Sequence, residues 1–296
     1  MGGQSGVEME IDPMDYKTFT AVPYGPMLGA EILDIDLTSP LSSESEAELK
    51  QAFLEYQVLF FRDQKISFDD HARIAGLFGP LGTHVGKKTI SKPTDHPAVR
   101  RFHADETSKK VSGDVWHSDQ SCAAVPPMAS MLYIHTVPPM SGGDTMFASM
   151  YAAYDALSPR MKTYLEGLTA IHDGVPIFGE GTPATEHPIV VTHPETGRKL
   201  LFVNVAFTTR VVGLSEVESK HLLAFLFEHC AMPEWQIRFR WQPHSIAFWD
   251  NRCAHHRAIF DYWPHVRSGY RVQIEGTDKP RADLAPGNDT SDVAAE

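Results

Sequence analysis

Short apolar runs of strand length recur along this chain, but they do not alternate regularly with helices. Two of them, at 57–64 and 245–251, read QVLFFRDQ and SIAFWDN. Patterns typical of helices occur at 42–56, 67–82, 150–168 and 215–230, and the alternation at 28–37 is typical of an edge strand. The chain contains no GxGxxG motif. Strands without strict strand–helix alternation are typical of a sandwich or barrel with helices packed outside it. The sequence therefore predicts a mainly β fold with flanking helices.

The composition limits both the domain organisation and the classes of partner. The chain has 296 residues, 42 % of them hydrophobic, which is enough for one large core. We expect a single domain at 16–280 between a flexible N-terminus, 1–15, and a flexible tail, 281–296. A net charge of −12 without a basic cluster disfavours binding to nucleic acid. No apolar run has the length of a membrane span.

The three cysteines are widely spaced and form no CxxC motif. A disulfide framework is not expected from so few cysteines, and buried thiols in a reducing compartment fit them better. The first residues, MGGQSGVEMEIDP, lack the basic start and apolar core of a secretory signal. These features predict a cytoplasmic protein.

A His-x-Asp pair occurs at His117 and Asp119, within the run VWHSDQS. The apolar flanks VW and CAAV predict a strand here. In a strand, residues two apart point to the same face, so both side chains could reach one metal ion. A second pair with this spacing, His103 and Asp105, runs into the polar stretch ETSKK. Spacing alone does not distinguish a metal site from two surface groups. The metal hypothesis therefore requires a third ligand from a distant segment.

The segment 245–276 contains two neighbouring histidines, His255 and His256, and two arginines four positions apart, Arg267 and Arg271. Neighbouring residues of an extended segment face opposite sides, so only one of the two histidines can point into a site. The arginines share a face if the segment is a strand, and burial there would require anionic partners. Exposed arginines would require no anionic partner. The sequence pattern does not decide whether these two arginines are buried or exposed.

Several motifs in order resemble the Fe(II)/2-oxoglutarate-dependent taurine dioxygenase family: WHSD, GGDT, FVN…FTTR and WDNRCAHHRAIFDYWPHVRSGYR, preceded by LGAEI and FFRDQ. The resemblance covers residues 20–280. It implies a double-stranded β-helix, a cupin-like jelly roll with helices outside it. It also implies an oxidoreductase that uses Fe(II) and O₂ to hydroxylate a small organic acid, while 2-oxoglutarate is converted to succinate and CO₂.

The resemblance assigns roles to residues that match its motifs. The iron ligands fall on His117, Asp119 and His256, the second histidine of the neighbouring pair. The arginine that holds the distal carboxylate of 2-oxoglutarate falls on Arg267, and Thr145 of GGDT shares that carboxylate. A bound Asp119 leaves no place for a halide on the iron, so hydroxylation is expected rather than halogenation.

The resemblance also implies a set of substrate contacts: His84, Gln120, Phe178, Phe207 and Arg271. Arg271 would bind the acid group of the substrate, and the two phenylalanines fit plain core packing as well as they fit site walls. The chain has Gly113 where taurine-specific members have an asparagine, and Ile177 where they have a serine. We therefore expect a small anionic substrate: a sulfonate such as taurine or a relative of it, or an aryloxy- or alkyl-carboxylate.

Two other classes of function remain to be tested. A zinc hydrolase could use the same three ligands, but it would give Arg267 and Thr145 no role. A non-catalytic cupin-like binding protein could keep the fold without turnover. Members of the family commonly form dimers or tetramers, so the resemblance also predicts a homo-oligomer.

Overall fold

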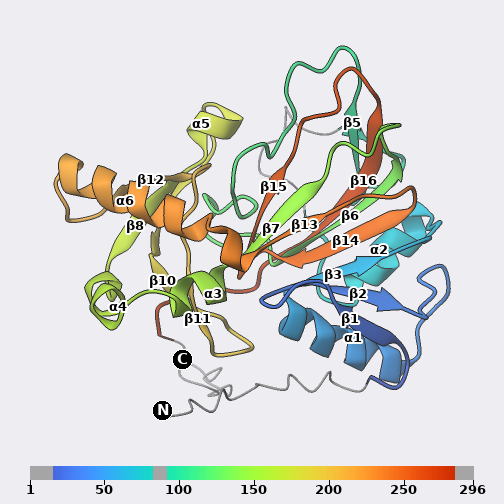
Figure 1. Ribbon diagram of the computed structural model, residues 1–296, viewed down its shortest axis with the longest axis horizontal. Helices are drawn as coiled ribbons and strands as arrows, with labels where there is room; N and C mark the ends of the chain where they lie inside the picture. The colour runs from blue at the N-terminus through green and yellow to red at the C-terminus, as the bar shows by residue number, and fades with distance from the viewer. Residues whose placement is uncertain (1–15, 83–91, 284–296) are drawn as a thin grey trace, which may run out of the picture.

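The computed structural model describes residues 16–82 and 92–283, and it contains two facing β-sheets. The larger sheet has eight strands in the order β1-β2-β3-β14-β6-β16-β5-β4, and the smaller has three in the order β13-β7-β15 (Figure 1). All pairings within these two sheets are antiparallel except that of β2 with β3. This arrangement is the predicted mainly β fold with flanking helices, a jelly roll.

The strands of the larger sheet are β1 (Thr20–Pro23), β2 (Ala30–Leu33), β3 (Val58–Phe61), β4 (Lys92–Pro93), β5 (Arg100–Ala104), β6 (Ala129–Thr136), β14 (Ser245–Asp250) and β16 (Arg267–Ile274). The smaller sheet consists of β7 (Thr145–Ser149), β13 (Gln236–Phe239) and β15 (Ala254–Ala258). Two further small sheets contain β8 (Thr169–Asp173), β9 (Ala184–Pro188) and β12 (Thr208–Val211), and β10 (Val190–Thr192) with β11 (Lys199–Leu201).

The helices are α1 (Ser43–Tyr56), α2 (Phe68–Gly76), α3 (Met150–Asp155), α4 (Pro159–Leu165), α5 (Val175–Phe178) and α6 (Glu216–Cys230), with a 3₁₀ turn at Pro233–Trp235. Helix α1 begins where predicted, because the hydroxyl of Ser42 accepts a hydrogen bond from the Ser45 amide. Between α3 and α4, Ser158 caps a new helix whose first residue is Pro159, and proline cannot continue a helix already running. The single helix expected from 150 to 168 is therefore two.

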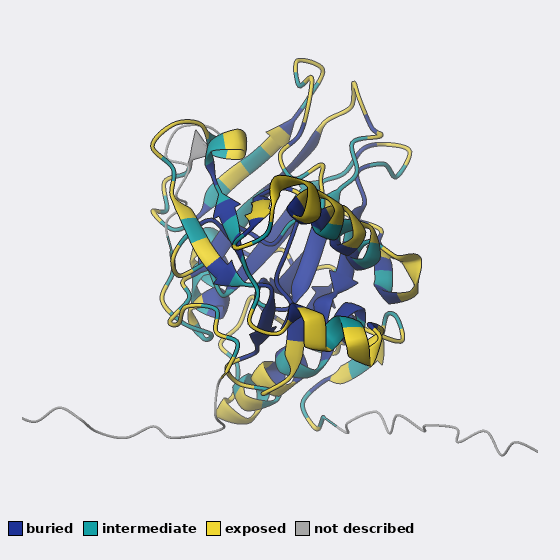
Figure 2. Ribbon diagram, turned by 90° about the vertical axis from the view of Figure 1, so that its left-hand side faces the viewer, coloured by how far each residue is buried: buried dark blue, intermediate teal, exposed yellow. Residues whose placement is uncertain are grey.

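Buried aromatic and aliphatic side chains fill the space on both sides of the larger sheet. Its outer face packs against α1 and α2, where the rings of Phe53 and Phe248 stack 4.4 Å apart. Its inner face packs against the smaller sheet, where Phe60 and Phe239 stack 4.0 Å apart. Figure 2 shows these strands buried at the centre and the outward faces of the helices exposed. Each such ring contributes roughly 1.5–3 kcal/mol by burial.

Strand β16 determines which polar side chains face the space between the two sheets. Its outward residues Val272 and Ile274 belong to the core beneath the helices. Side chains alternate along a strand, so Arg267, Arg271 and Gln273 point inward. The inner face of the larger sheet therefore carries two arginines, as the sequence predicts for a strand in this segment.

Two element predictions need correction. The segment 28–37 was expected to contain an edge strand, but β2 lies between β1 and β3, and the edge is β1. The helix expected to run to residue 82 ends at Gly76, followed by a turn ahead of Pro80. Thr192 donates hydrogen bonds to the carbonyls of Arg281 and Ala282, close to the end of the described residues.

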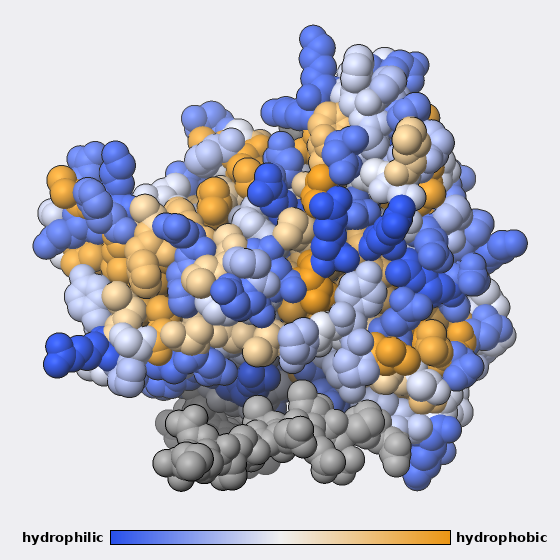
Figure 3. Space-filling model, viewed as in Figure 1, coloured by the Kyte–Doolittle hydropathy of each residue, from blue (hydrophilic) through white to orange (hydrophobic). Residues whose placement is uncertain are grey.

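Within the described ranges, no helix is long and apolar enough to cross a bilayer. On the side of the molecule that carries α6, the surface shows several apolar patches (Figure 3). Exposed apolar side chains of that helix include Val217 and Phe225.

Candidate active site

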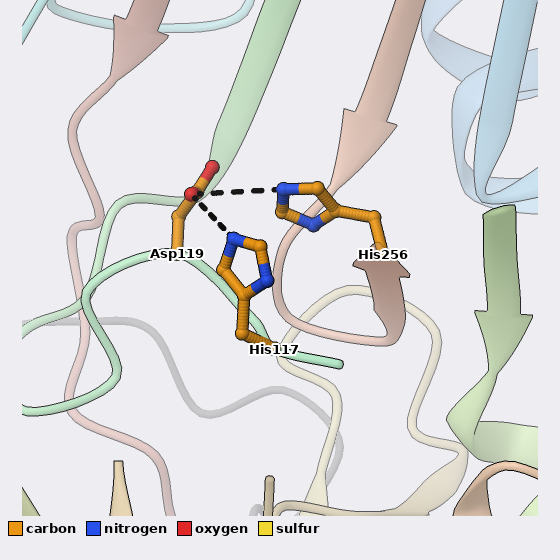
Figure 4. A group of neighbouring side chains, drawn as sticks. All are labelled: His117, Asp119 and His256. Carbon is orange, nitrogen blue, oxygen red and sulfur yellow. Dashed lines mark ion pairs between the residues drawn. The ribbon is translucent and has the colours of Figure 1, made fainter. Parts of the chain in front are cut away.

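Three buried side chains from two distant segments converge between the sheets. The Oδ1 atom of Asp119 lies 3.7 Å from Nε2 of His117 and 3.8 Å from Nε2 of His256 (Figure 4). The three ligand atoms lie within 4.8 Å of one another. Two atoms bound about 2.0–2.2 Å from one metal ion lie at most about 4.2 Å apart, so each oxygen–nitrogen pair is within reach of a shared ion. The residues thus fit a two-histidine, one-carboxylate site for Fe(II).

The backbone holds two of these ligands in place. The amide of His117 donates to the carbonyl of His256, and the amide of His256 donates to the carbonyl of His117, at 3.1 and 2.9 Å. This isolated bridge is the only β-pairing at His117 within the described chain, and a turn at Asp119 follows it. The expectation that the pair lies within a strand is therefore wrong. Both side chains still reach one point, because the turn brings Asp119 back toward the bridge.

The neighbouring histidine, His255, is directed away from the cluster. Residues 254–258 form β15, in which His256 pairs with Phe147 and His255 with Ala148, so the two rings lie on opposite faces. The ring of His256 lies 4.0 Å from that of His117 and 4.6 Å from that of Trp249. The structure thus brings together the three residues that the sequence suggested as ligands.

The protonation state of the two histidines suits metal binding. Burial lowers the pKa of His117 and of His256 below the ordinary value, although Asp119 acts in the opposite direction. The Nδ1–H of His117 donates to the carbonyl of Val115 at 2.8 Å, because a carbonyl can only accept. The lone pair of His117 is therefore on Nε2, the atom that faces Asp119.

The second oxygen of Asp119 is held by protein groups. The Oδ2 atom accepts from the Ser130 hydroxyl at 2.7 Å and from Nη2 of Arg271 at 2.5 Å. Burial alone would raise the pKa of Asp119, but the charge of Arg271 and the two histidines outweigh it and keep the pKa well below the usual range. Asp119 is therefore ionised, with Oδ1 turned toward the histidines.

Asn251 joins the ligand turn to the end of β14. Its carbonyl accepts a hydrogen bond from the Ser118 hydroxyl, and its Oδ1 accepts from the indole N–H of Trp249 at 2.9 Å. The side-chain amide of Asn251 donates to Ser130 at 3.2 Å. Sequence reasoning did not single out Ser130 or Asn251, because their roles depend on which strands lie side by side.

A second group of polar side chains surrounds Arg267. This guanidinium is 2 % exposed and lies over the rings of Phe102 and Trp241, with Cζ 5.0 and 5.3 Å from their centroids. Its Nε and Nη2 atoms make no hydrogen bond to any described residue. Burial lowers the pKa of Arg267 to about 10, so it remains charged at neutral pH. A buried cation with unpaired N–H donors on two nitrogen atoms requires an anion.

Thr145 begins β7 on the same side of the site as Arg267. The indole N–H of Trp241, whose ring Arg267 overlies, donates to the Thr145 hydroxyl at 3.0 Å, which leaves the hydroxyl proton available to another acceptor. The preceding glycines of GGDT make close packing possible. A Cβ at Gly143, whose φ is +80°, would lie 2.6 Å from Cδ of Arg267. The motif thus lets the chain pass directly beside the arginine.

The remaining predicted substrate contacts lie in different surroundings. Gln120 is buried and donates to Oε1 of Gln273 at 2.8 Å. The rings of Phe178, at the end of α5, and Phe207 lie 5.5 Å apart and pack with Cys122, three residues after Asp119. His84 lies outside the described residues.

The second His-x-Asp pair is not part of this site. His103 lies on the outer face of β5, where its Nδ1 is 3.2 Å from the Ser268 hydroxyl and its Nε2 is 3.4 Å from Asp105. No other histidine or carboxylate joins them in a cluster within the described chain. The preference for His117 and Asp119 over this pair agrees with the geometry.

A second buried group, His193, Asp250 and Cys253, has ligand atoms at similar distances. Both oxygens of Asp250 already accept from the Arg252 guanidinium, at 2.8 and 2.7 Å. The Nδ1 atom of His193 accepts from the amides of residues 195 and 196, so its Nε2–H donates to Asp250 at 3.2 Å. Burial raises the pKa of Cys253 well above the ordinary value. This group is a satisfied structural contact, because its carboxylate oxygens are already hydrogen-bonded and its thiol stays protonated and is a poor metal ligand.

Comparisons with known proteins agree with this geometry. The profile of a family described as "Taurine catabolism dioxygenase TauD, TfdA family" matches residues 20–273. An alpha-ketoglutarate-dependent (that is, 2-oxoglutarate-dependent) 2,4-dichlorophenoxyacetate dioxygenase from Cupriavidus pinatubonensis is 35 % identical over 262 residues, 80 % of this chain and 91 % of that protein. An alpha-ketoglutarate-dependent sulfonate dioxygenase from Saccharomyces cerevisiae is 32 % identical over 288 residues, 89 % of this chain and 68 % of that protein.

Solved structures show the same fold. The crystal structure of a taurine dioxygenase from Burkholderia xenovorans superposes with a TM-score of 0.79 at 34 % identity, covering 89 % of this chain and 92 % of that one.

Proposed function

This chain belongs to the taurine catabolism dioxygenase TauD, TfdA family and is a 2-oxoglutarate-dependent dioxygenase, and from that premise we propose that its active site is the cluster of His117, Asp119 and His256. The observation that carries the proposal is the convergence of their three ligand atoms within 4.8 Å, in a buried position. Fe(II) bound there would supply the activation of O₂ that couples decarboxylation of 2-oxoglutarate to hydroxylation of a substrate C–H bond.

Arg267 and Thr145 would hold 2-oxoglutarate by its distal carboxylate. Two nitrogen atoms of Arg267, Nε and Nη2, make no hydrogen bond to the described residues, and burial strengthens any charge-assisted bond that they donate. The hydroxyl of Thr145 already accepts from Trp241, so it would donate to the same carboxylate. These contacts would hold the far end of the cosubstrate and would leave its keto acid end free to bind the metal ion.

Arg271 would bind the acid group of the substrate. Its side chain is 24 % exposed, and its Nε makes no hydrogen bond within the described ranges. Its Nη2 bonds both Asp119 and Ser130, which places the bound acid next to the ligand cluster. A substrate held at Arg271 would therefore present the carbon nearest its acid group for oxidation.

We propose a sulfonate such as taurine or a relative of it as the substrate class, with an aryloxy- or alkyl-carboxylate as the alternative. The sulfonate and 2,4-dichlorophenoxyacetate dioxygenases among the relatives support both classes. Hydroxylation of a carbon that bears a sulfonate or aryloxy group gives an adduct that breaks down to a carbonyl compound, with release of sulfite or a phenol. A Cβ at Gly113, whose φ is +82°, would lie 3.0 Å from Cε1 of His117, so a side chain there would be strained and would crowd that ring. Phe178 and Phe207 would line an apolar wall of the site.

The test begins with metal and cosubstrate under anaerobic conditions. Adding Fe(II) and 2-oxoglutarate should give a weak visible charge-transfer band, which zinc would not give. On exposure to O₂, a panel of sulfonates and aryloxy- or alkyl-carboxylates should include compounds that drive succinate formation. Asp119→Ala should lose both signals, and the matched variant Asp105→Ala, in the other His-x-Asp pair, should keep them.

Two outcomes would contradict the proposal. A wild-type protein without the band would oppose binding of iron and 2-oxoglutarate at this site. A band without substrate-driven succinate formation across the panel would favour a non-catalytic binding protein. A cytoplasmic location and a dimeric or tetrameric assembly stay predictions, and sedimentation of the purified protein would test the assembly.

A further inference from the structure

A third arginine shares the inner face of the larger sheet with Arg267 and Arg271. On the outer face, His103 of β5 lies 3.2 Å from Ser268 of β16, its partner in the register. Side chains alternate, so Phe102 points inward, and the Arg267 guanidinium lies over its ring. Arg100, two residues before Phe102, therefore points inward as well. In the register of the two strands it stands directly opposite Arg271.

Two arginines in this position repel each other unless an anion lies between them. Opposite residues of an antiparallel pair have Cβ atoms roughly 4.5–5.5 Å apart, and like charges there are destabilising. Arg271 is paired with Asp119, whereas Arg100 makes no ion pair with any residue in 16–82 or 92–283. The segment between these ranges, 83–91, reads THVGKKTIS and has no acidic residue to offer. Arg100 is half-buried, so a bound molecule can reach it.

The metal ion and 2-oxoglutarate, once bound, would not cancel the excess positive charge of these two arginines. The two charges of Fe(II) would be balanced by Asp119 and by one carboxylate of 2-oxoglutarate, and the other carboxylate would balance Arg267. The positive charges of Arg271 and Arg100 then remain. A substrate with a single negative charge neutralises only one of them.

Building on the proposed function, we propose that Arg100 and Arg271 form a two-arginine subsite, and that the substrate is an organic acid with two acidic groups. Arg271 binds the group next to the carbon that is oxidised, and Arg100 binds the second group. A short sulfonate that also carries a carboxylate has this chemistry. Guanidinium groups suit both anions, because each presents a planar fork of N–H donors.

A matched pair of compounds tests the subsite without turnover. The two compounds are propane-1-sulfonate, which ends in a methyl group, and 3-sulfopropanoate, which has a carboxylate in place of that methyl group. Their dissociation constants would be measured by calorimetry on protein loaded with Mn(II) and saturating 2-oxoglutarate, which occupies Arg267. The wild-type protein should bind 3-sulfopropanoate at least about tenfold more tightly, because the second charge gains a charge-assisted hydrogen bond.

Variants of β5 locate the effect. Arg100→Gln should bring the ratio of the two dissociation constants close to one, whereas Arg100→Lys should retain most of the preference. Arg101→Gln is the matched control, since Arg101 is the next residue and lies on the outer face. It should leave the ratio at the wild-type value. Thermal unfolding would establish that each variant is folded.

Some outcomes overturn this inference and leave the proposed function intact. These are equal binding of the two compounds by the wild-type protein, no binding of 3-sulfopropanoate at millimolar concentration, or an equal loss of preference in Arg100→Gln and Arg101→Gln. Failure of 2-oxoglutarate itself to bind the Mn(II)-loaded protein would instead contradict the proposed function.

Discussion

Replacing Ser130 with alanine should weaken metal binding while leaving the three ligands unchanged. The hydroxyl of Ser130 lies 2.7 Å from Oδ2 of Asp119. Three N–H groups point at the same hydroxyl oxygen, from Asn251, Arg271 and Gln273, at 3.2, 3.2 and 3.4 Å. They occupy its lone pairs, so its single proton is committed to Asp119. That bond keeps Oδ2 occupied and leaves Oδ1 for the metal.

The expected magnitude follows from the charge on the acceptor. A hydrogen bond to a charged group contributes about 1.5–3 kcal/mol, and about 1.4 kcal/mol corresponds to a tenfold change in an equilibrium constant. Arg271 still holds Oδ2 in the variant, which places the effect toward the lower end of that range. We therefore expect Ser130→Ala to raise the dissociation constant for Mn(II) or Co(II) about tenfold. A tenfold loss lies at the lower end of the roughly 10–100-fold losses of metal affinity that follow removal of a group that orients a metal ligand.

The assay is calorimetric titration of the metal-free protein. Ser149→Ala is the matched control, because Ser149 is equally buried and donates to Gln57 at 2.7 Å, a residue outside the ligand cluster. Both variants should lose a similar free energy of unfolding, and only Ser130→Ala should lose metal affinity. Wild-type affinity in Ser130→Ala, or an equal loss in both variants, would refute the reasoning.

Three further outcomes are expected. Arg267→Ala should weaken 2-oxoglutarate binding far more than substrate binding, and Arg271→Ala should do the reverse. Calorimetry would measure the dissociation constant of each compound for each variant. Equal changes in the two variants would show that this division of roles is wrong. His256→Ala should lose stoichiometric binding of Co(II), whereas His255→Ala, one residue away on the opposite face of β15, should keep it, and an inverse result would reassign the third ligand. Burial lowers the pKa of His172 and of His255 to about 3. The unfolded chain therefore binds protons below pH 6.5 that the folded chain does not, so each group should reduce the free energy of unfolding by up to about 1.4 kcal/mol per pH unit between pH 6.5 and 3; urea unfolding curves that coincide at pH 7 and 5 would contradict this.

Local sequence patterns were sufficient for the fold class and for the positions of the polar residues on β16. The alternation that places Arg267 and Arg271 on one face needs only a strand, and β16 supplies it. The choice between His255 and His256 followed from the family motif, and the face of β15 that each occupies agrees with it. Such inferences work because they depend on residues close together in the chain.

What the sequence did not reveal depends on contacts between distant strands. Nothing in the sequence around Ser130 indicates a role for it, because that role depends on the position of β6 between β14 and β16. Arg100 gains significance only from the register that sets it opposite Arg271. The strand expected around His117 is replaced by one bridge and a turn, and the Ser118 hydroxyl at this turn bonds the carbonyl of Asn251, a residue far away in the chain. The pattern of one strand indicates which of its faces is buried, but it does not indicate which distant strand pairs with it.

The paired amide–carbonyl contacts between His117 and His256 have a consequence for how such enzymes diverge. Because main-chain atoms set the spacing of these two ligands, that spacing does not depend on which side chains surround them. Segments that we propose to contact the substrate, such as α5, can then acquire new residues over evolutionary time while this backbone pairing is kept. One reaction centre can in this way serve many different acids.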